Sequence, residues 1–397
     1  MAFVARILYW LLATPRYVPR SDADQYQQLA TNIARGRGFS LYFPQLDLHQ
    51  TAFRPPLYPF ALAGWYRVFG NSIVAGRVFS LCAGVAAVAL TWLLLRKVSG
   101  TLAATVGALA VAVYPPLLAN DTAILTEPLS LALLAGMLLA LASKRWAVGA
   151  SLCGLLILSR PSAQFLLVLL VLWVLWQFGW KRCLAFGAIA AVVVSPWVVR
   201  NWVVMGAPVL VTSNGFNAAA MYSPQARETG GFVDPVFDER FSEFRLSQFD
   251  EIEWQQKLQA LAVDSLKAHP NQVVAVLRKN TLAYFEIRPS NNRSAEELDG
   301  RNMRFRNLML PLFYLVTVAG IFGLAVHRRE PIVLLLIGIS SYFVASSLFI
   351  VAPPRLRAPF DWCCCIGLGL AVSWLASRRE RSRPPVTSAC TTPVPSG

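Results

Sequence analysis

The chain has 397 residues, of which 56% are hydrophobic and only 14% are charged, and this composition excludes an ordinary soluble protein. The net charge of +15 would suit a nucleic-acid partner, but the basic residues stand largely in pairs at the ends of apolar runs. That placement is typical of the cytoplasmic connections of a membrane protein, so nucleic acid is excluded as a partner. Recurring apolar runs of roughly 18 to 22 residues predict a multi-spanning, all-α membrane protein.

The apolar runs predict about ten transmembrane helices, with both termini in the cytoplasm. The first run, Phe3 to Ala13, is short for a span, so we expect a tilted or frayed helix, or a start codon placed too late. The later runs cover Ile73–Leu95, Thr101–Leu118, Ile124–Ala142, Trp146–Ser159, Phe165–Phe178, Leu184–Val199, Leu308–Val326, Ile332–Val351 and Phe360–Ala376.

These runs divide the chain into four parts. They are an N-terminal transmembrane module (1–199) with a first outer loop (15–59), an extracytoplasmic loop region (200–306), C-terminal transmembrane helices (307–376) and a disordered cytoplasmic tail (377–397). The loop region carries equal numbers of acidic and basic residues, so it is a balanced surface of mixed, mainly helical structure.

Local patterns within the loop region predict four elements. Pro208 to Thr212 is expected to be a strand, and Asn214-Gly215 a turn. The spacing of apolar residues predicts an amphipathic helix over Glu251 to Ala268 and a second helix over Asn271 to Tyr284.

The first outer loop carries two closely spaced carboxylates, Asp22 and Asp24, at the start of a short helical pattern that ends at Gly36. An Arg54-Pro-Pro sequence follows and leads back into the membrane. We interpret this loop as the catalytic edge of a membrane-embedded sugar transferase.

Apart from the cytoplasmic basic pairs, the notable ionisable residues near the ends of spans are predicted on the outer side. They are Asp22, Asp24, Arg54, Asp121, Glu127, Arg160, Arg200, Arg355, Arg357 and Asp361. A carboxylate one turn inside a membrane helix, as predicted for Glu127, is costly unless it faces protein, water or a cation. Acids facing arginines at one depth suit a substrate that carries both a phosphate and a sugar, because a carboxylate can act as general base and guanidinium groups bind phosphate.

Simpler interpretations stay open for several of these residues. Asp22 and Asp24 could be helix caps or solvated loop residues, and capping is the favoured interpretation for Asp121. Arg160 could end a helix and, like Arg355 and Arg357, anchor the protein to lipid headgroups. The run Cys363-Cys364-Cys365 is interpreted as apolar packing, since adjacent helical residues cannot form a compact metal site.

Several short motifs, in order and spacing, resemble the GT-C superfamily of membrane glycosyltransferases, specifically bacterial enzymes similar to protein mannosyltransferases and the lipid A aminoarabinose transferase. The motifs are Asp22-Ala-Asp-Gln-Tyr26, Gly36-Arg-Gly-Phe39, Arg54-Pro-Pro-Leu-Tyr-Pro59, Leu125-Thr-Glu-Pro128, Arg160-Pro161, Pro196-Trp-Val-Val-Arg-Asn201 and Arg355-Leu-Arg-Ala-Pro359. The resemblance spans about residues 21 to 374.

The resemblance implies an inner-membrane hexosyl- or pentosyltransferase that moves a sugar, with inversion, from a polyprenyl-phosphate donor to an extracytoplasmic glycan, lipid or protein acceptor. It implies that Asp22 is the general base, with Asp24 and Glu127 as further catalytic acids. It assigns substrate contacts to Arg54, Asp121, Arg160, Arg200, Asn201, Arg355 and Arg357. A divalent cation, Mg²⁺ or Mn²⁺, between Asp22 and Glu127 is an optional cofactor.

Two alternatives remain at this point. One is a flippase or transporter of lipid-linked sugars, although transporters tend to place charges near the membrane midplane, on broken helices and internal repeats, rather than at one face. The other is a catalytically inactive protein of the same fold.

Overall fold

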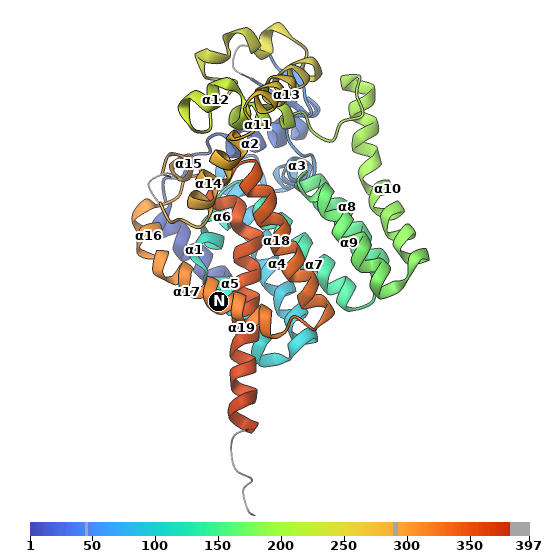
Figure 1. The fold of residues 1–397 in the computed structure, drawn as a ribbon, viewed down its shortest axis with the longest axis vertical. Coiled ribbons are helices and arrows are strands. Elements are labelled where there is room, and N and C mark those ends of the chain that lie inside the picture. The colour runs from blue at the N-terminus through green and yellow to red at the C-terminus, as the bar shows by residue number, and fades with distance from the viewer. Residues whose placement is uncertain (44–46, 289–292, 382–397) are drawn as a thin grey trace, which may run out of the picture.

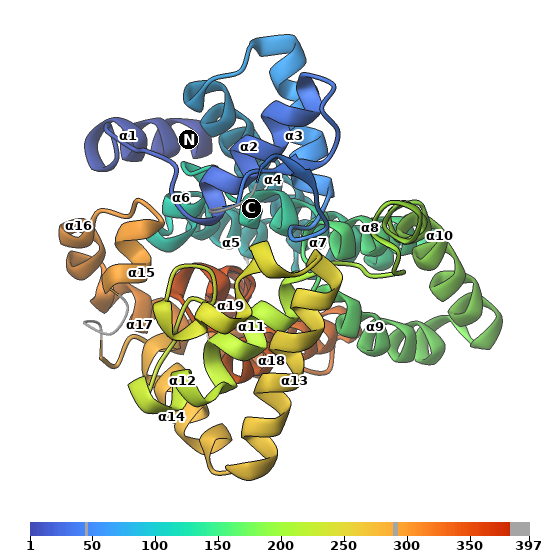
Figure 2. The ribbon, with the colours of Figure 1, turned by 90° about the horizontal axis from the view of Figure 1, so that it is seen from above.

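The computed structural model describes residues 1–43, 47–288 and 293–381. A bundle of helices carries a smaller group at one end, the cap helices α11 (Ser213–Tyr222), α12 (Pro224–Thr229) and α13 (Glu251–Ala268) (Figure 1). Seen from above, the cap helices lie over the near ends of α18 (Pro331–Phe349) and α19 (Ala358–Arg381) (Figure 2).

Four helices are each long and apolar enough to cross a membrane, within the part of the chain that the structure describes. They are α4 (Ile73–Ser99), α10 (Trp180–Met205), α18, and α19 together with the preceding 3-10 turn η4 (Pro354–Arg357). The bent pair α5 (Thr101–Val113) and α6 (Pro115–Asp121) brings the number to five. The expected count of about ten spans is therefore not shown.

The other apolar helices are too short to span by length alone. They are α1 (Ala2–Ala13), α7 (Glu127–Ala142), α8 (Trp146–Ser159), α9 (Ala163–Phe178) and α17 (Leu310–Val326). Even the 17 residues of α17 extend only about 26 Å at 1.5 Å per residue, against a hydrocarbon core of about 30 Å. The bounds of these helices lie within about three residues of the predicted runs, so the apolar composition predicted both where they lie and how long they are.

The predicted single run over Thr101 to Leu118 is broken by a 60° bend between α5 and α6. Tyr114 stands at the break in an extended conformation (φ −68°, ψ 118°) and precedes Pro115. A residue before proline is disfavoured in the helical region, so the chain turns here, and α6 ends at Asp121 inside the bundle.

The bundle core packs through very close helix crossings. Along α17 and α19, a Cβ placed on Gly323 would lie 1.8 Å from the carbonyl oxygen of Gly367, so a larger residue would push the two backbones apart. The neighbouring Cys363, Cys364 and Cys365 are all buried in this core, as apolar packing residues would be.

A second core joins the cap helices to the first outer loop, which contains α2 (Asp22–Ala34) and the antiparallel strands β1 (Ser40–Leu41) and β2 (His49–Gln50) and leads into α3 (Leu57–Phe69). Buried aromatic rings fill it, among them Phe53 and Trp254. Glu251, at the start of α13, accepts a hydrogen bond from the backbone nitrogen of Ala52 at 2.9 Å and one from the hydroxyl of Thr212. The first outer loop and the cap are therefore packed against each other.

Two local predictions in this region are wrong. Pro208 to Thr212 is not a strand, because side chains of α10 bind its carbonyl groups: Trp197 Nε1 donates to Leu210 at 2.7 Å and Asn201 Nδ2 to Val209 at 2.8 Å. The residues Asn214-Gly215 are not a turn but lie within α11. A Cβ on Gly215 would stand 2.0 Å from the carbonyl oxygen of Gln255, so the glycine permits α11 to cross α13 closely.

Other local predictions are confirmed. The helix over Glu251 to Ala268 is α13, and the next is α14 (Gln272–Tyr284). Two more short helices, α15 (Arg293–Leu298) and α16 (Met303–Leu308), lead into α17, and the short elements η1 (Glu239–Phe244) and η2 (Leu246–Gln248) precede α13. Helix α19 continues to Arg381, so residues 377–381 of the predicted disordered tail are helical; residues 382–397 lie outside the described residues.

Candidate active site

The carboxylate of Asp22, the first residue of α2, is held between two guanidinium groups. Arg54 donates to one of its oxygens and Arg355 to the other, and the Asp22 side chain is 17% exposed. Burial alone would raise the pKa of Asp22, but the positive charges of Arg355 and Arg54 lower it to about 2. The preceding residue, Ser21, has a φ of 51°, which is uncommon outside glycine.

Arg54 reaches Asp22 from the segment between β2 and α3, and α2 fixes its direction. Its Nε donates to the side-chain oxygen of Gln25 at 2.6 Å, and its guanidinium lies 5.0 Å from the ring centre of Phe53 and 5.8 Å from that of Tyr26. The helical spacing of Asp22 and Gln25 therefore gives both acceptors for one arginine on one face of α2.

Arg355, in η4, reaches the same carboxylate from the far end of the chain. Its second terminal nitrogen pairs with Asp299 at 3.2 Å, and its backbone oxygen accepts a hydrogen bond from Asn120 Nδ2 at 3.4 Å. The Nε of Arg355 is buried and has no hydrogen-bond partner among the described residues. Arg355 thus retains one unused donor beside the candidate base.

Glu127, at the start of α7, is 3% exposed, and its Oε2 has no hydrogen-bond partner among the described residues. Its negative charge acts on Arg160, Arg355 and Tyr26, so it lies within electrostatic range of the Asp22 site. A buried carboxylate oxygen without a donor is costly unless a ligand supplies one.

Arg160 caps the C-terminal end of α8 and is 9% exposed. Its Nη2 donates to the carbonyl oxygen of Leu356 at 3.1 Å, next to Arg355, and its guanidinium lies 5.1 Å from the ring centre of Phe343. The structure therefore brings together five of the predicted site residues, namely Asp22, Arg54, Glu127, Arg160 and Arg355.

The other predicted site residues lie apart from this group. Asp24 accepts a 2.6 Å hydrogen bond from Gln28 on its own helix. Asp121 pairs with Arg6 of α1 at 2.5 Å in the buried core, at the end of α6 and not at the start of a helix. Arg200 donates to the backbone oxygen of Thr51 and to Gln50, both at 2.8 Å, whereas Asn201 binds the Val209 carbonyl.

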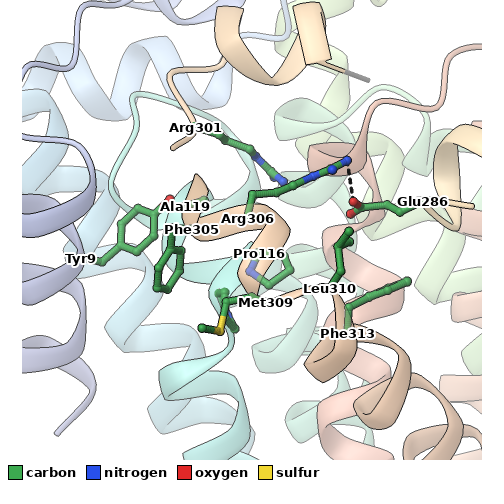
Figure 3. A pocket seen from close by; sticks show the side chains of 11 residues that line it. Tyr9, Pro116, Ala119, Glu286, Arg301, Phe305, Arg306, Met309, Leu310 and Phe313 are labelled. Carbon is green, nitrogen blue, oxygen red and sulfur yellow. Dashed lines mark ion pairs between the residues drawn. The ribbon is translucent and has the colours of Figure 1, made fainter. Parts of the chain in front are cut away.

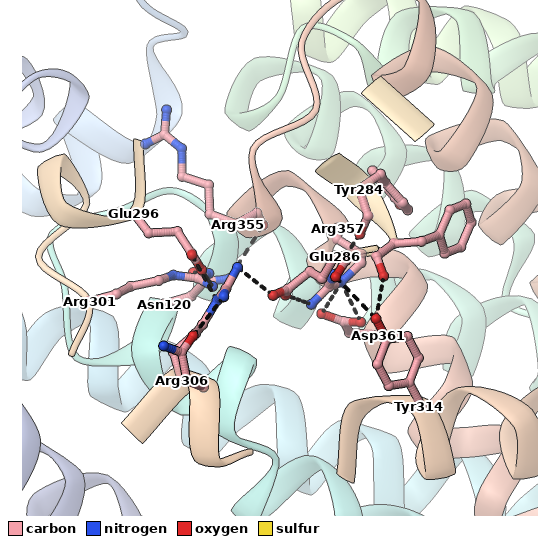
Figure 4. A network of polar contacts seen from close by, with 12 residues as sticks. Asn120, Tyr284, Glu286, Glu296, Arg301, Arg306, Tyr314, Arg355, Arg357 and Asp361 are labelled. Carbon is pink, nitrogen blue, oxygen red and sulfur yellow. Dashed lines mark hydrogen bonds and ion pairs between the residues drawn. The ribbon is translucent and has the colours of Figure 1, made fainter. Parts of the chain in front are cut away.

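Arg357 belongs to a buried network that sequence reasoning did not identify (Figure 4). It pairs with Glu286 at 2.9 Å and with Asp361 at 3.0 Å, and it donates to the backbone oxygen of Tyr284 at 2.6 Å. The network continues through Arg306, which pairs with Glu286 at 2.6 Å and Glu296 at 2.9 Å. The alternation of acidic residues and arginines between residues 286 and 306 is the sequence pattern that could have predicted this network.

A pocket borders this network, between α1, α6, α16 and α17 (Figure 3). Its walls are mostly apolar, with Arg301, Arg306 and Glu286 at its polar edge. Neither Asp22 nor Arg355 lines it, so it is separate from the site at Asp22.

The residues expected to bind a divalent cation do not fit one in this arrangement. Both oxygens of Asp22 face guanidinium groups, which leaves Glu127 as the one expected ligand with an unpartnered carboxylate oxygen among the described residues. Over the described residues, no group of three or more His, Cys, Asp or Glu side chains gathers in a way that could hold a metal ion. No step below is routed through a cation.

Comparison with known proteins gives one family and one fold. Residues 53–200 match the family described as dolichyl-phosphate-mannose-protein mannosyltransferase. No curated protein sequence matches the chain significantly. Arg54, Glu127 and Arg160 lie in the matched segment, and the structure joins them to Asp22 and Arg355 outside it.

Three solved structures illustrate the similarity. AglB, the oligosaccharyltransferase of Archaeoglobus fulgidus, in complex with an inhibitory peptide and a dolichol-phosphate is 12% identical with a TM-score of 0.53, and the match covers 95% of this chain and 50% of AglB. The Archaeoglobus fulgidus oligosaccharyltransferase in complex with Zn and sulfate is 14% identical with a TM-score of 0.53, covering 96% of this chain and 50% of that one. ArnT from Cupriavidus metallidurans bound to undecaprenyl phosphate is 15% identical with a TM-score of 0.43, covering 96% and 80%.

The chain spans about half the length of the archaeal enzyme, and identities this low show a shared fold alone. The resemblance predicted from the sequence is confirmed. The protein is a multi-pass integral membrane protein whose residues 53–200 are similar to the dolichyl-phosphate-mannose-protein mannosyltransferase family and whose fold is similar to that of the archaeal oligosaccharyltransferase AglB.

Proposed function

We propose that the protein transfers a sugar from a polyprenyl-phosphate donor to a hydroxyl group of an extracytoplasmic acceptor, with inversion at the anomeric carbon. The observation that carries this proposal is the carboxylate of Asp22 between Arg54 and Arg355, with Glu127 and Arg160 in electrostatic range. One carboxylate to accept a proton and several guanidinium groups to bind a phosphate are what such a transfer needs.

In the proposed reaction the acceptor oxygen forms a bond to the anomeric carbon as the bond from that carbon to the phosphate oxygen breaks. The acceptor proton passes to Asp22, and the electron pair of the broken bond leaves with the polyprenyl phosphate. Negative charge grows on the departing phosphate, so guanidinium groups fixed beside it stabilise the transition state more than the ground state.

Asp22 is a weak base while it is paired with two arginines, because its pKa is lowered to about 2. A bound donor phosphate offers the same arginines a competing anion. When one guanidinium turns from Asp22 to the phosphate, the basicity of Asp22 rises and the leaving group gains a counterion. Donor binding would thus activate the base.

We assign the phosphate to Arg54, Arg160 and Arg355, and a hydroxyl group of the donor sugar to the unpartnered Oε2 of Glu127. Arg355 also has a buried Nε without a partner among the described residues, so a buried donor and a buried acceptor of this site are both unpartnered there. Arg357 is a poorer phosphate ligand, because Glu286, Asp361 and a backbone carbonyl already occupy its nitrogens.

We assign acceptor selection to the cap. Asp234, which follows α12, has its pKa raised by burial, and the charges of Arg54 and Asp22 act on it. This segment of the cap therefore lies near enough to the candidate base to contact an acceptor beside it.

The test is sugar transfer by the full chain in lipid vesicles, supplied with a labelled polyprenyl-phosphate sugar and a crude envelope fraction as acceptor. Asp22→Asn is expected to lower the rate by about 10² to 10⁴, the usual contribution of a general base. Asp24→Asn is the matched control, because Asp24 lies on the same helix but accepts its hydrogen bond from Gln28 and pairs with no arginine among the described residues.

Three results would count against the proposal. An Asp22→Asn rate near that of wild type would remove Asp22 as the base, and a loss of tenfold or less would make it a positioning residue. Movement of labelled lipid across the vesicle membrane without any covalent product would instead support the flippase alternative.

A further inference from the structure

Arg355 is shared between two carboxylates from distant parts of the chain. One terminal nitrogen contacts Asp22 of α2, and the other contacts Asp299, which follows α15, at 3.2 Å. The Asp299 side chain is 9% exposed, and no sequence motif had singled it out. A planar guanidinium bound at both ends has a fixed direction, which a single ion pair would not give it.

The segment that carries Asp299 is itself well anchored. Its neighbour Gly300 has a φ of 76°, and a Cβ there would lie 2.5 Å from the ring of Tyr17. The next residue, Arg301, donates to the side-chain oxygen of Asn120 at 2.8 Å. Asn120 also donates to the backbone oxygen of Arg355, so one residue holds both the Asp299 segment and η4.

We infer that Asp299 is a positioning residue of the candidate active site, holding Arg355 by one terminal nitrogen while the other nitrogen exchanges between Asp22 and the donor phosphate. This inference rests on the proposed function and assigns a role within it. An arginine that must leave Asp22 for a phosphate needs a second anchor, or it would swing away from both. Asp299 supplies that anchor, and the buried, unpartnered Nε of Arg355 is a further donor for the incoming phosphate.

The electrostatic surroundings give Asp299 a useful signature. Burial raises its pKa, the charges of Arg355 and Arg301 lower it, those of Asp22 and Glu127 raise it, and the result is a pKa of about 6. The charge of Asp299 acts in turn on the neighbouring Tyr17 and contributes to its raised pKa. Asp299 therefore loses its charge in mildly acidic solution, whereas Asp22 stays ionised far below that pH.

The experiment compares donor kcat/KM of wild type and Asp299→Asn, in vesicles, between pH 5 and pH 8. At pH 8 the variant is expected to be about tenfold slower, as for the loss of one charged hydrogen bond. Below about pH 6 the two curves should converge, because the wild-type residue is then neutral too. A merely structural role for Asp299 would give a ratio that does not change with pH.

Two further variants complete the test. Glu330→Gln removes an exposed carboxylate at the start of α18 and should match wild type at every pH. Asp299→Glu keeps the charge and should recover most of the rate at pH 8. If Asp299→Asn does not accumulate in membranes, the pH profile of Asp299→Glu decides instead. A shift in the pH at which its kcat/KM falls in acid supports the inference, and an unchanged pH overturns it. An Asp299→Asn rate equal to that of wild type at pH 8, or a ratio constant with pH, also overturns it.

Failure of the proposed function is distinguishable from failure of this inference. If wild type transfers no sugar from any polyprenyl donor, the proposed function fails and the inference is judged on binding of undecaprenyl phosphate itself. The affinity of Asp299→Asn for undecaprenyl phosphate should then be about tenfold weaker than that of wild type at pH 8 and equal to it at pH 5. Equal affinities at both pH values would overturn the role of Asp299.

Discussion

The carboxylate of Asp22 pairs with the guanidinium of Arg355, which lies 333 positions later in the chain. The contact joins the first outer loop to the turn that opens the last helix of the bundle. The candidate base is therefore assembled only when the two ends of the fold have packed together, and its protonation depends on both.

Asp22→Asn is expected to lower the stability of the folded protein as well as its activity. The pKa of Asp22 is lowered on folding from 3.8 to about 2, so its stabilising contribution is present above about pH 4 and is lost as pH falls through about 2. At pH 7 the difference from wild type should be about 2 kcal/mol, at about 1.4 kcal/mol per pKa unit. Thermal unfolding of wild type and variant in detergent, at pH 7 and in acid, measures this stability difference. If the difference were equal at both pH values, the ion pairs of Asp22 with Arg54 and Arg355 would not be its cause.

Glu127→Gln is expected to separate activity from stability. The change removes a buried charge whose Oε2 lacks a hydrogen-bond partner among the described residues, so the melting temperature should stay the same or rise. The transfer rate should fall by roughly one to two orders of magnitude if Glu127 binds the donor sugar, as for a lost charged hydrogen bond.

Glu251→Gln is the matched control for Glu127→Gln. Glu251 is similarly buried, but one of its oxygens accepts hydrogen bonds from Ala52 and Thr212 and the other faces His49. A glutamine keeps one acceptor oxygen but loses the charge that strengthens these contacts, so this variant should lose about 1 kcal/mol of stability. If Glu127→Gln were the less stable of the two, Glu127 would be a structural residue.

Asp121→Asn should act on stability rather than on the reaction. The change leaves Arg6 without its counterion in the buried core, which typically costs about 3 to 5 kcal/mol. The double variant Arg6→Met with Asp121→Leu should recover most of that loss. The transfer rate of Asp121→Asn, divided by the amount of folded protein in the sample, is expected to match that of wild type. A lower rate in the double variant would instead indicate that Asp121 contacts the substrate.

His49 is expected to make the contact between β2 and α13 sensitive to pH. Its Nε2 lies 3.3 Å from Glu251 Oε2, and this hydrogen bond raises the pKa of His49 above its ordinary 6.5. The stabilisation is complete below pH 6.5 and is lost as pH rises through the higher folded-state pKa. Hydrogen exchange at β2, corrected for intrinsic rate, should be roughly twofold slower at pH 6 than at pH 8.5, in keeping with a partly exposed ion pair. His49→Gln should abolish that difference.

Several elements were predictable because their signals are local. The apolar spacing of α13 and the boundaries of α8 follow from residues within a few turns of each other, and both helices were predicted with their observed bounds. The pair Asn214-Gly215 was misinterpreted as a turn, since a glycine permits several structures and the neighbouring helix α13 decides between them.

Within the candidate site, the sequence determined which residue types were available and roughly where each stood along a helix or loop. Asp22, Arg54, Glu127, Arg160 and Arg355 were all predicted as site residues. The sequence did not determine that Asp24 and Asp121 would bind elsewhere, or that Asp299 and Glu286 would hold arginines. Ion pairs between residues far apart in the chain depend on how whole helices pack, and no local pattern of residues determines the distance between two such side chains. The tertiary structure therefore decided which charges meet.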